Sequence, residues 1–367
     1  MMLISQPFRA RFFKWFVAPT VAVAAAAFAF PFAGYDGIEK SENPDFQPVM
    51  QAVFVIDRLW LLHDDGLLVS LKIDQAIPEK AAINGRVSAI CKSGSNLVAV
   101  VEGNRKRWTL KRHVAGQWNY IASVPMESDR LAALDCSNEE IGVTILTDKR
   151  LLDVSGSNVR QLNLKNKISS PLTNGIALTS GDVVWVGFNA GEWGGGLSHI
   201  NRASGKVENV EYNKSGNLCG GPLNTACDPI NGIVTSPAKP SCVIAAVGLV
   251  HMMAHGRIVE ICSKSVRRLY FKPLDPQPPH NQLDDGEPSS TVAFFGLARA
   301  GDTIWAVGID GLYRFDGTTA PQFQPLPKFE NRGGYFVSFD VPEIVLVMTD
   351  VNQRTSLSGA SPIILTR

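Results

Sequence analysis

The sequence GDVVWVGF at residues 181–188, followed by GLSHINR from residue 196, recurs as GDTIWAVG at residues 301–308, followed by GLYRFD from residue 311. In each copy a Gly-Asp turn opens a short apolar strand, and a loop and a Gly-Leu pair lead into the next strand. Short strands that recur at a long period are typical of repeat proteins in which each unit is one antiparallel sheet. The two copies therefore predict an all-β chain built as a β-propeller.

Similar apolar strands recur along the rest of the chain. We expect the second strand of each blade to begin at seven positions: Arg58, Asn96, Glu140, Asp182, Cys242, Asp302 and Glu343. Successive starts are 38 to 60 residues apart, close to common propeller repeats apart from two insertions. The sequence predicts a seven-bladed ring. Because the last blade runs out before a fourth strand, we expect an N-terminal strand near residues 46–50 to complete it and close the ring.

The two copies quoted above resemble the repeat of bacterial two-component-regulator propellers. The shared features are the Gly-Asp turn, a strand with Trp and Val-Gly, and a Gly-Leu step followed by an aromatic residue or His. The resemblance covers two of the seven expected blades. It implies a sensor-type or ligand-binding propeller, and it transfers no catalytic residues because that repeat carries none.

Residues 1–34 differ in composition from the rest of the chain. Arg9, Arg11 and Lys14 precede an uncharged run over residues 16–34 that contains the small-residue sequence AFA at 27–29. This order is typical of a secretory signal peptide, and the run is also long enough for an uncleaved membrane anchor. Both alternatives place residues 35–367, expected to be a single propeller domain, in the periplasm or outside the cell. Membrane contact is expected only through the N-terminal segment, if it stays uncleaved.

Six cysteines in an exported chain favour disulfides, since such bridges persist in oxidising compartments. One pair flanks a loop rich in Gly, Pro and Asn, one flanks a predicted hairpin, and one precedes the second strands of consecutive blades. The expected pairs are Cys219 with Cys227, Cys242 with Cys262, and Cys91 with Cys136. The alternative for each pair is two buried free thiols.

Charge and motif content exclude several functions. The chain carries 35 Lys and Arg against 34 Asp and Glu, so no overall field attracts nucleic acid. The sequence has no Gly-x-Ser-x-Gly elbow, phosphate loop or dinucleotide fingerprint. We therefore expect no nucleic-acid partner, no cofactor and no assigned catalytic residue.

Long loops are expected to gather on one face. In a blade of alternating strands, the second-to-third turns open on the same face as the connections between blades. This places the glycine-rich loop 191–196, the insertion 213–229, the turn 251–255 and the insertion 272–290 on the face of blades four to six. Long loops on a rigid scaffold commonly carry function, so we expect the binding site there.

Glu192 and Trp193 in the glycine-rich loop are the first expected binding residues. Glycines allow a ligand to approach the backbone, and an exposed indole offers a large contact area. The alternative is that Trp193 folds back to cap its own blade.

Five further residues are expected on this face. His251, His255, His280, Asp284 and Asp285 combine imidazole and carboxylate groups, which can bind zinc or a similar ion. His251 and His255 lie in a strand and turn, where the sequence does not fix the directions of their side chains. We therefore assign these residues to binding and expect no metal.

The sequence as a whole predicts a secreted or periplasmic propeller that binds a protein, peptide or glycan, or serves as a scaffold. One alternative is a periplasmic lyase or hydrolase that uses the His and carboxylate residues of the same face. Another is a structural component of an envelope assembly.

Overall fold

The computed structural model describes residues 49–72, 78–104, 106–136, 142–166, 168, 175–211, 221–251, 253–263, 265–274, 290–317, 320–327, 335–341, 343–349 and 363–367. The expected signal or anchor at residues 1–34, and parts of both expected insertions, lie outside these ranges. Within them, no helix is long and apolar enough to span a bilayer.

The described residues form seven successive antiparallel strand units, numbered here in chain order. Unit one is β1 (Val49–Val55), β2 (Arg58–His63), β3 (Leu68–Lys72) and β4 (Glu79–Lys80); unit two is β5 (Arg86–Ser93), β6 (Asn96–Gly103), β7 (Arg107–Val114) and β8 (Gln117–Pro125). Unit three is β9 (Leu131–Asp135), β10 (Val143–Thr147), β11 (Arg150–Ser155) and β12 (Asn158–Asn163); unit four is β13 (Gly175–Ser180), β14 (Val183–Gly187), β15 (Leu197–Asn201) and β16 (Val207–Val210). Unit five is β17 (Ile230–Thr235), β18 (Cys242–His251), β19 (Met253–Cys262) and β20 (Ser265–Tyr270); unit six is β21 (Phe294–Ala300), β22 (Thr303–Gly308), β23 (Gly311–Phe315) and β24 (Gln322–Pro325). Unit seven is β25 (Tyr335–Ser338), β26 (Ile344–Thr349) and β27 (Ile363–Thr366), and a short helix, η1 (Gly191–Trp193), lies between β14 and β15.

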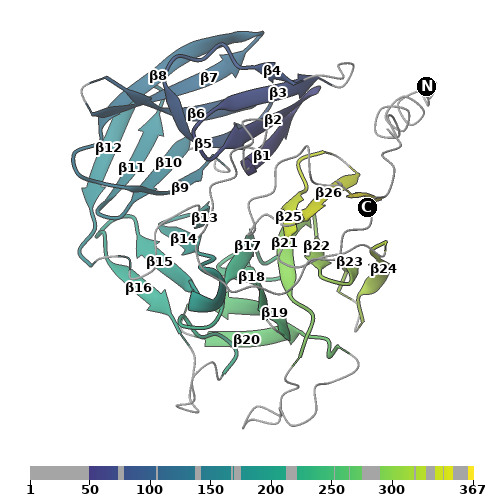
Figure 1. Cartoon of the computed structure of the whole chain (residues 1–367). Coiled ribbons are helices and arrows are strands. Elements are labelled where there is room, and N and C mark those ends of the chain that lie inside the picture. The colour runs from purple at the N-terminus through teal and green to yellow at the C-terminus, as the bar shows by residue number, and fades with distance from the viewer. Residues whose placement is uncertain are drawn as a thin grey trace, which may run out of the picture.

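The second strands begin where the sequence predicts. They start at residues 58, 96, 143, 183, 242, 303 and 344, each within three residues of the expected position. Figure 1 shows the units following one another around the molecule, from purple β1 through teal β13 to green and yellow β21–β26. The nearly all-β prediction is confirmed.

Units three and four differ from the separate blades that we expected. Their first strands, β9 and β13, pair in parallel and join the two units into one eight-stranded sheet. Gly175 allows this approach, because a Cβ there would lie 2.9 Å from the carbonyl oxygen of Ala132 and 2.6 Å from the ring of Phe188. The local sequence pattern predicts each strand but not this contact between units.

Apolar clusters fill the spaces between neighbouring units. Trp185 and Leu197 of unit four pack with Ile230 and Val243 of unit five, for example. Trp60 of β2 is 2% exposed and belongs to the cluster between units one and two. Each unit therefore buries the faces of its sheet against its neighbours.

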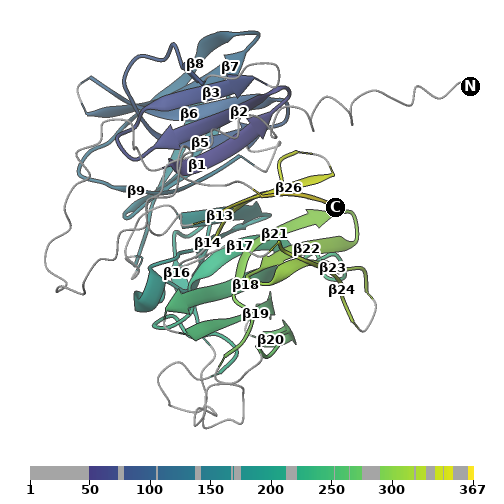
Figure 2. The same cartoon turned by 45° about the vertical axis from the view of Figure 1, so that its right-hand side comes forward.

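The first and last units also meet. Phe336 and Leu346 of unit seven pack against Ala52 and Leu61 of unit one. Both views place β26 beside the first sheet (Figures 1 and 2). Apolar packing thus joins the first and last described units.

The strand expected to complete the last blade is described only in part. Val49 and Met50 belong to β1, which pairs with β2 of unit one. Residues 46–48 lie outside the described ranges, within which unit seven has three strands. Completion of that unit by an N-terminal strand stays a prediction.

Two expected disulfides are present. Cys91 of β5 is joined to Cys136 after β9, and this bond links units two and three. Cys242 and Cys262 face each other across the β18–β19 hairpin with their Cα atoms 4.4 Å apart. Cys227 is also disulfide-bonded, but its expected partner, Cys219, lies outside the described residues.

Candidate functional site

The glycine-rich loop between β14 and β15 is fixed by its own backbone. The Phe188 N–H donates to the carbonyl of Gly196 at 3.0 Å, and the Ala190 N–H donates to that of Gly194 at 2.8 Å. Gly195 has a φ of +133°, and a Cβ there would lie 2.1 Å from the oxygen of Phe188. Glycine is therefore required for this loop conformation.

The loop is also attached to the connection that enters unit five. The N–H of Gly195 donates to the carbonyl of Thr225 at 3.2 Å, and that of Gly196 donates to the carbonyl of Asp228 at 2.9 Å. On this support Trp193 is 77% exposed, which contradicts the alternative of an indole folded back onto its blade. The structure presents a large apolar side chain to solvent from a well-anchored loop.

Glu192 and His251 come together as neighbours of Trp193. The Glu192 Oε2 atom lies 2.9 Å from His251 Nε2, and both side chains are about half exposed. The contact joins η1 of unit four to the end of β18 in unit five. Three of the expected binding residues therefore form one surface, which we call the Trp193 surface.

His255 has different surroundings from those expected. Residues 251–255 were predicted as a loop, but β18 and β19 pair up to His251 and Met253, so that His255 lies within β19. Its Nε2 is 2.7 Å from Nη1 of Arg257 and 3.3 Å from Oδ1 of Asp228. Because arginine can only donate, Nε2 accepts in the contact with Arg257.

Asp228 is the centre of this network, which the sequence analysis did not identify. Its carboxylate is fully buried, forms an ion pair with Arg257, and accepts the N–H of Asn224 at 2.6 Å. Arg257 also donates to the carbonyl of Pro222 at 2.7 Å. These bonds fix the connection at residues 221–229 beneath the glycine-rich loop. The signal in the sequence was Arg257, a charged residue within the largely apolar run of β19.

His280, Asp284 and Asp285 lie outside the described residues, so their place in the site stays a prediction. Within the described part of the chain, no group of three or more His, Cys, Asp or Glu residues could hold a metal ion.

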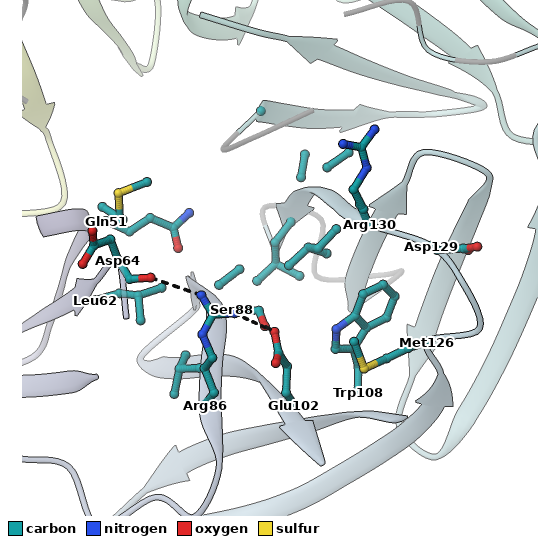
Figure 3. Close-up of a pocket in the computed structure, with 18 of the residues that line it drawn as sticks. Gln51, Leu62, Asp64, Arg86, Ser88, Glu102, Trp108, Met126, Asp129 and Arg130 are labelled. Carbon is teal, nitrogen blue, oxygen red and sulfur yellow. Dashed lines mark hydrogen bonds and ion pairs between the residues drawn. The ribbon is translucent and has the colours of Figure 1, made fainter. Parts of the chain in front are cut away.

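A separate pocket of about 390 Å³ lies where the first strands of units one to four begin (Figure 3). The sequence analysis did not predict it, because its walls come from distant segments. Its polar lining includes Gln51, Asp64, Arg86, Ser88, Glu102 and Arg130. Arg86 Nη1 donates to Glu102 Oε1 at 2.8 Å, and the Ser88 hydroxyl donates to the same oxygen at 2.8 Å.

Comparison with known proteins supports the fold. Neither a protein family nor a curated protein sequence matches this chain. The structure of YCF48 bound to D1 peptide is similar at a TM-score of 0.51 and 14% identity, over 87% of this chain and 92% of that chain. The β-propeller domain of Cps50 (Swd1) from Myceliophteria thermophila has a TM-score of 0.47 and 12% identity, over 88% of this chain and 98% of that chain.

A third similar structure is the extracellular domain of a protein assigned to the one-component systems of B. thetaiotaomicron. It has a TM-score of 0.49 and 12% identity, and the match covers 84% of this chain. This chain spans only 38% of the length of that domain. At 14% identity the similarity to the YCF48 structure concerns the fold alone and says nothing about activity.

Proposed function

We propose that this chain is an exported β-propeller that binds a protein or peptide through the Trp193 surface on units four and five. The observation that carries the proposal is the 77% exposure of Trp193 on an anchored loop. Tryptophan is enriched among the residues that dominate protein interfaces. Because the loop is already fixed, little conformational entropy is lost when a partner orders it.

The neighbouring polar groups suit the rim of such an interface. Glu192 and His251 are half exposed and can exchange their mutual contact for contacts with a partner. The similar YCF48 structure is described with a bound D1 peptide, which favours a protein or peptide over a glycan as the partner class. We include His255, and His280, Asp284 and Asp285 of the insertion at 272–290, in the proposed binding face.

The seven units and the seam between units one and seven support a closed seven-bladed ring over residues 35–367. A closed ring provides a rigid base for the loops on one face.

The two described disulfides fit an extracellular or periplasmic location. The N-terminal segment, as signal peptide or anchor, would deliver the domain there.

The test is site-specific photo-crosslinking at position 193 in the native host, followed by affinity measurement with the purified partner. We expect Trp193→Ala to weaken binding by about 30-fold or more, since interface hot spots contribute about 2 kcal/mol or more. The far-ultraviolet spectrum and unfolding midpoint should stay unchanged, because the side chain is exposed.

Tyr120 provides the matched control. It is an exposed aromatic residue, at 65%, on β8 of unit two. Tyr120→Ala should retain full affinity, and crosslinking there should not recover the partner. Equal losses at both positions, or full affinity for Trp193→Ala, would reject the Trp193 surface as the binding site.

A further inference from the structure

We infer that the pocket at the start of the first strands is a second binding site, which takes a short peptide with both of its ends charged. It shares no residue with the Trp193 surface. The inference rests on two opposite charges on different sides of one pocket and on groups within it that can contact a peptide backbone.

A fixed carboxylate lies on one side of the pocket. Glu102 Oε1 accepts bonds from Arg86 and Ser88, while Arg86 is itself held by the carbonyls of Asp64 at 3.1 Å and Asp65 at 3.2 Å. Glu102 Oε2 has no partner within the described residues and remains able to accept. A peptide ammonium carries three donors and suits such an acceptor.

Glu102 is therefore the carboxylate on which this side depends. Asp64 also lines the pocket and holds Arg86 through its backbone carbonyl.

Arg130 provides the positive charge on the other side. Figure 3 shows Arg130 on one side of the pocket and Glu102 on another. The Nε atom of Arg130 is 3.7 Å from the Asp148 carboxylate, and its side chain is 72% exposed, so among the described residues its two terminal nitrogens have no partner. A free guanidinium fork matches a carboxylate. The neighbouring Asp129 is committed to the buried Arg150.

The size and lining of the pocket suit a short extended chain. A volume of about 390 Å³ is near the lower end for ligand pockets. Small residues, Ala89, Ala132 and Gly175, leave room between the walls. Gln51 accepts the N–H of Ile90 through Oε1 at 2.8 Å, which leaves its amide NH₂ for a peptide carbonyl.

Isothermal titration calorimetry with dialanine and trialanine tests the inference on the exported, full-length protein. We expect at least one of these peptides to bind, and the N-acetylated and C-amidated forms of that peptide to bind at least about tenfold more weakly. Glucose serves as an uncharged probe of similar size. Absence of binding by both peptides, equal binding of the blocked forms, or tighter binding of glucose would overturn the inference.

Variants assign the two sides. Arg130→Gln should remove the preference for a free carboxyl end, and Glu102→Gln should weaken the preference for a free amino end. Both residues have exposed or partly exposed side chains, so folding should be retained. Arg160→Gln, at an exposed arginine on β12, is the matched control and should bind as the parent does. Unchanged end preferences in both pocket variants would overturn the inference.

Trp193→Ala separates this site from the proposed function. It should lose the protein partner and still bind the alanine peptide, because the two sites share no residue.

Discussion

Arg150 and Arg257 each bury a guanidinium group to 2% exposure, and each is paired with a buried aspartate. The two pairs occupy equivalent places: Asp129 and Asp228 lie just before the first strand of units three and five, and the arginines lie in the third strands. Each pair therefore fixes an incoming connection to its own unit. In unit five that connection supports the glycine-rich loop, so a single buried ion pair contributes to the position of Trp193.

Removing one partner of the unit five pair should be costly. We expect Asp228→Ala to lower the free energy of unfolding by about 3–5 kcal/mol, because it leaves the Arg257 charge buried without compensation. Denaturant titration measures the change. Asp182→Ala, at an exposed turn aspartate, should stay within about 0.5 kcal/mol of the parent.

A double variant, Asp228→Leu with Arg257→Met, checks the cause. Replacing both charges with apolar groups should recover much of the loss. A loss below about 1 kcal/mol for the single variant would show that the pair contributes little to stability.

At the scale of elements, disulfides act at two levels. Cys242–Cys262 closes a hairpin across 20 residues inside unit five, where β18 and β19 already pair along their full length. Cys91–Cys136 spans 45 residues and ties the first strand of unit two to unit three. The first bond reinforces existing strand pairing, whereas the second joins two units that are also held by side-chain packing and by the bond from Arg150 to the Pro125 carbonyl.

The two bonds should differ in their contributions. Loop-closure entropy predicts about 4 kcal/mol for Cys91–Cys136 and about 3 kcal/mol for Cys242–Cys262. Replacing each pair with serines, followed by urea unfolding of exported protein, measures both losses. A larger loss for the hairpin bond would show that loop length does not determine the order.

At the scale of the whole molecule, Asp340 provides polar contacts at the seam between the first and last units, beside the apolar packing described above. Its Oδ2 accepts the N–H of Phe54 in β1 at 3.3 Å and the hydroxyl of Ser338 at 3.0 Å. Its carbonyl accepts Lys92 Nζ of unit two at 3.1 Å. Burial raises the pKa of Asp340 above its ordinary value, against the opposing effects of these donors and of Lys92 and Arg367.

The raised pKa sets the sign of a pH effect. Since the folded state holds the proton more tightly, the protonated carboxyl contributes stability that is complete below the unfolded pKa of about 3.9 and is lost as pH rises through the folded pKa. Asp340→Asn keeps an acceptor and cannot ionise. We therefore expect the parent to lose stability relative to this variant as pH increases from about 3.5 to neutrality.

Denaturant titrations of both proteins across that range measure the difference. A difference that is independent of pH, or one that changes in the opposite direction, would contradict a raised pKa at the seam.

Local patterns in the sequence determined the units of this protein and their order. Turn residues and alternating apolar strands act over a few neighbours, so the starts of the second strands could be predicted. The disulfides within the hairpin and between consecutive units followed from the same strand positions. Glu192, Trp193 and His251 could be assigned to one surface because chain topology alone places their loops on one face.

Tertiary structure decided the features that join distant segments. Three features depend on contacts across units or long connections. They are the parallel pairing of β9 with β13, the burial of Asp228 against Arg257, and the pocket lined by units one to four. No local pattern encodes such contacts, because the free energy of a buried charge or a shared wall depends on what the rest of the fold places beside it. His255 shows the difference: its sequence suggested a loop, and pairing with β18 made it part of a strand.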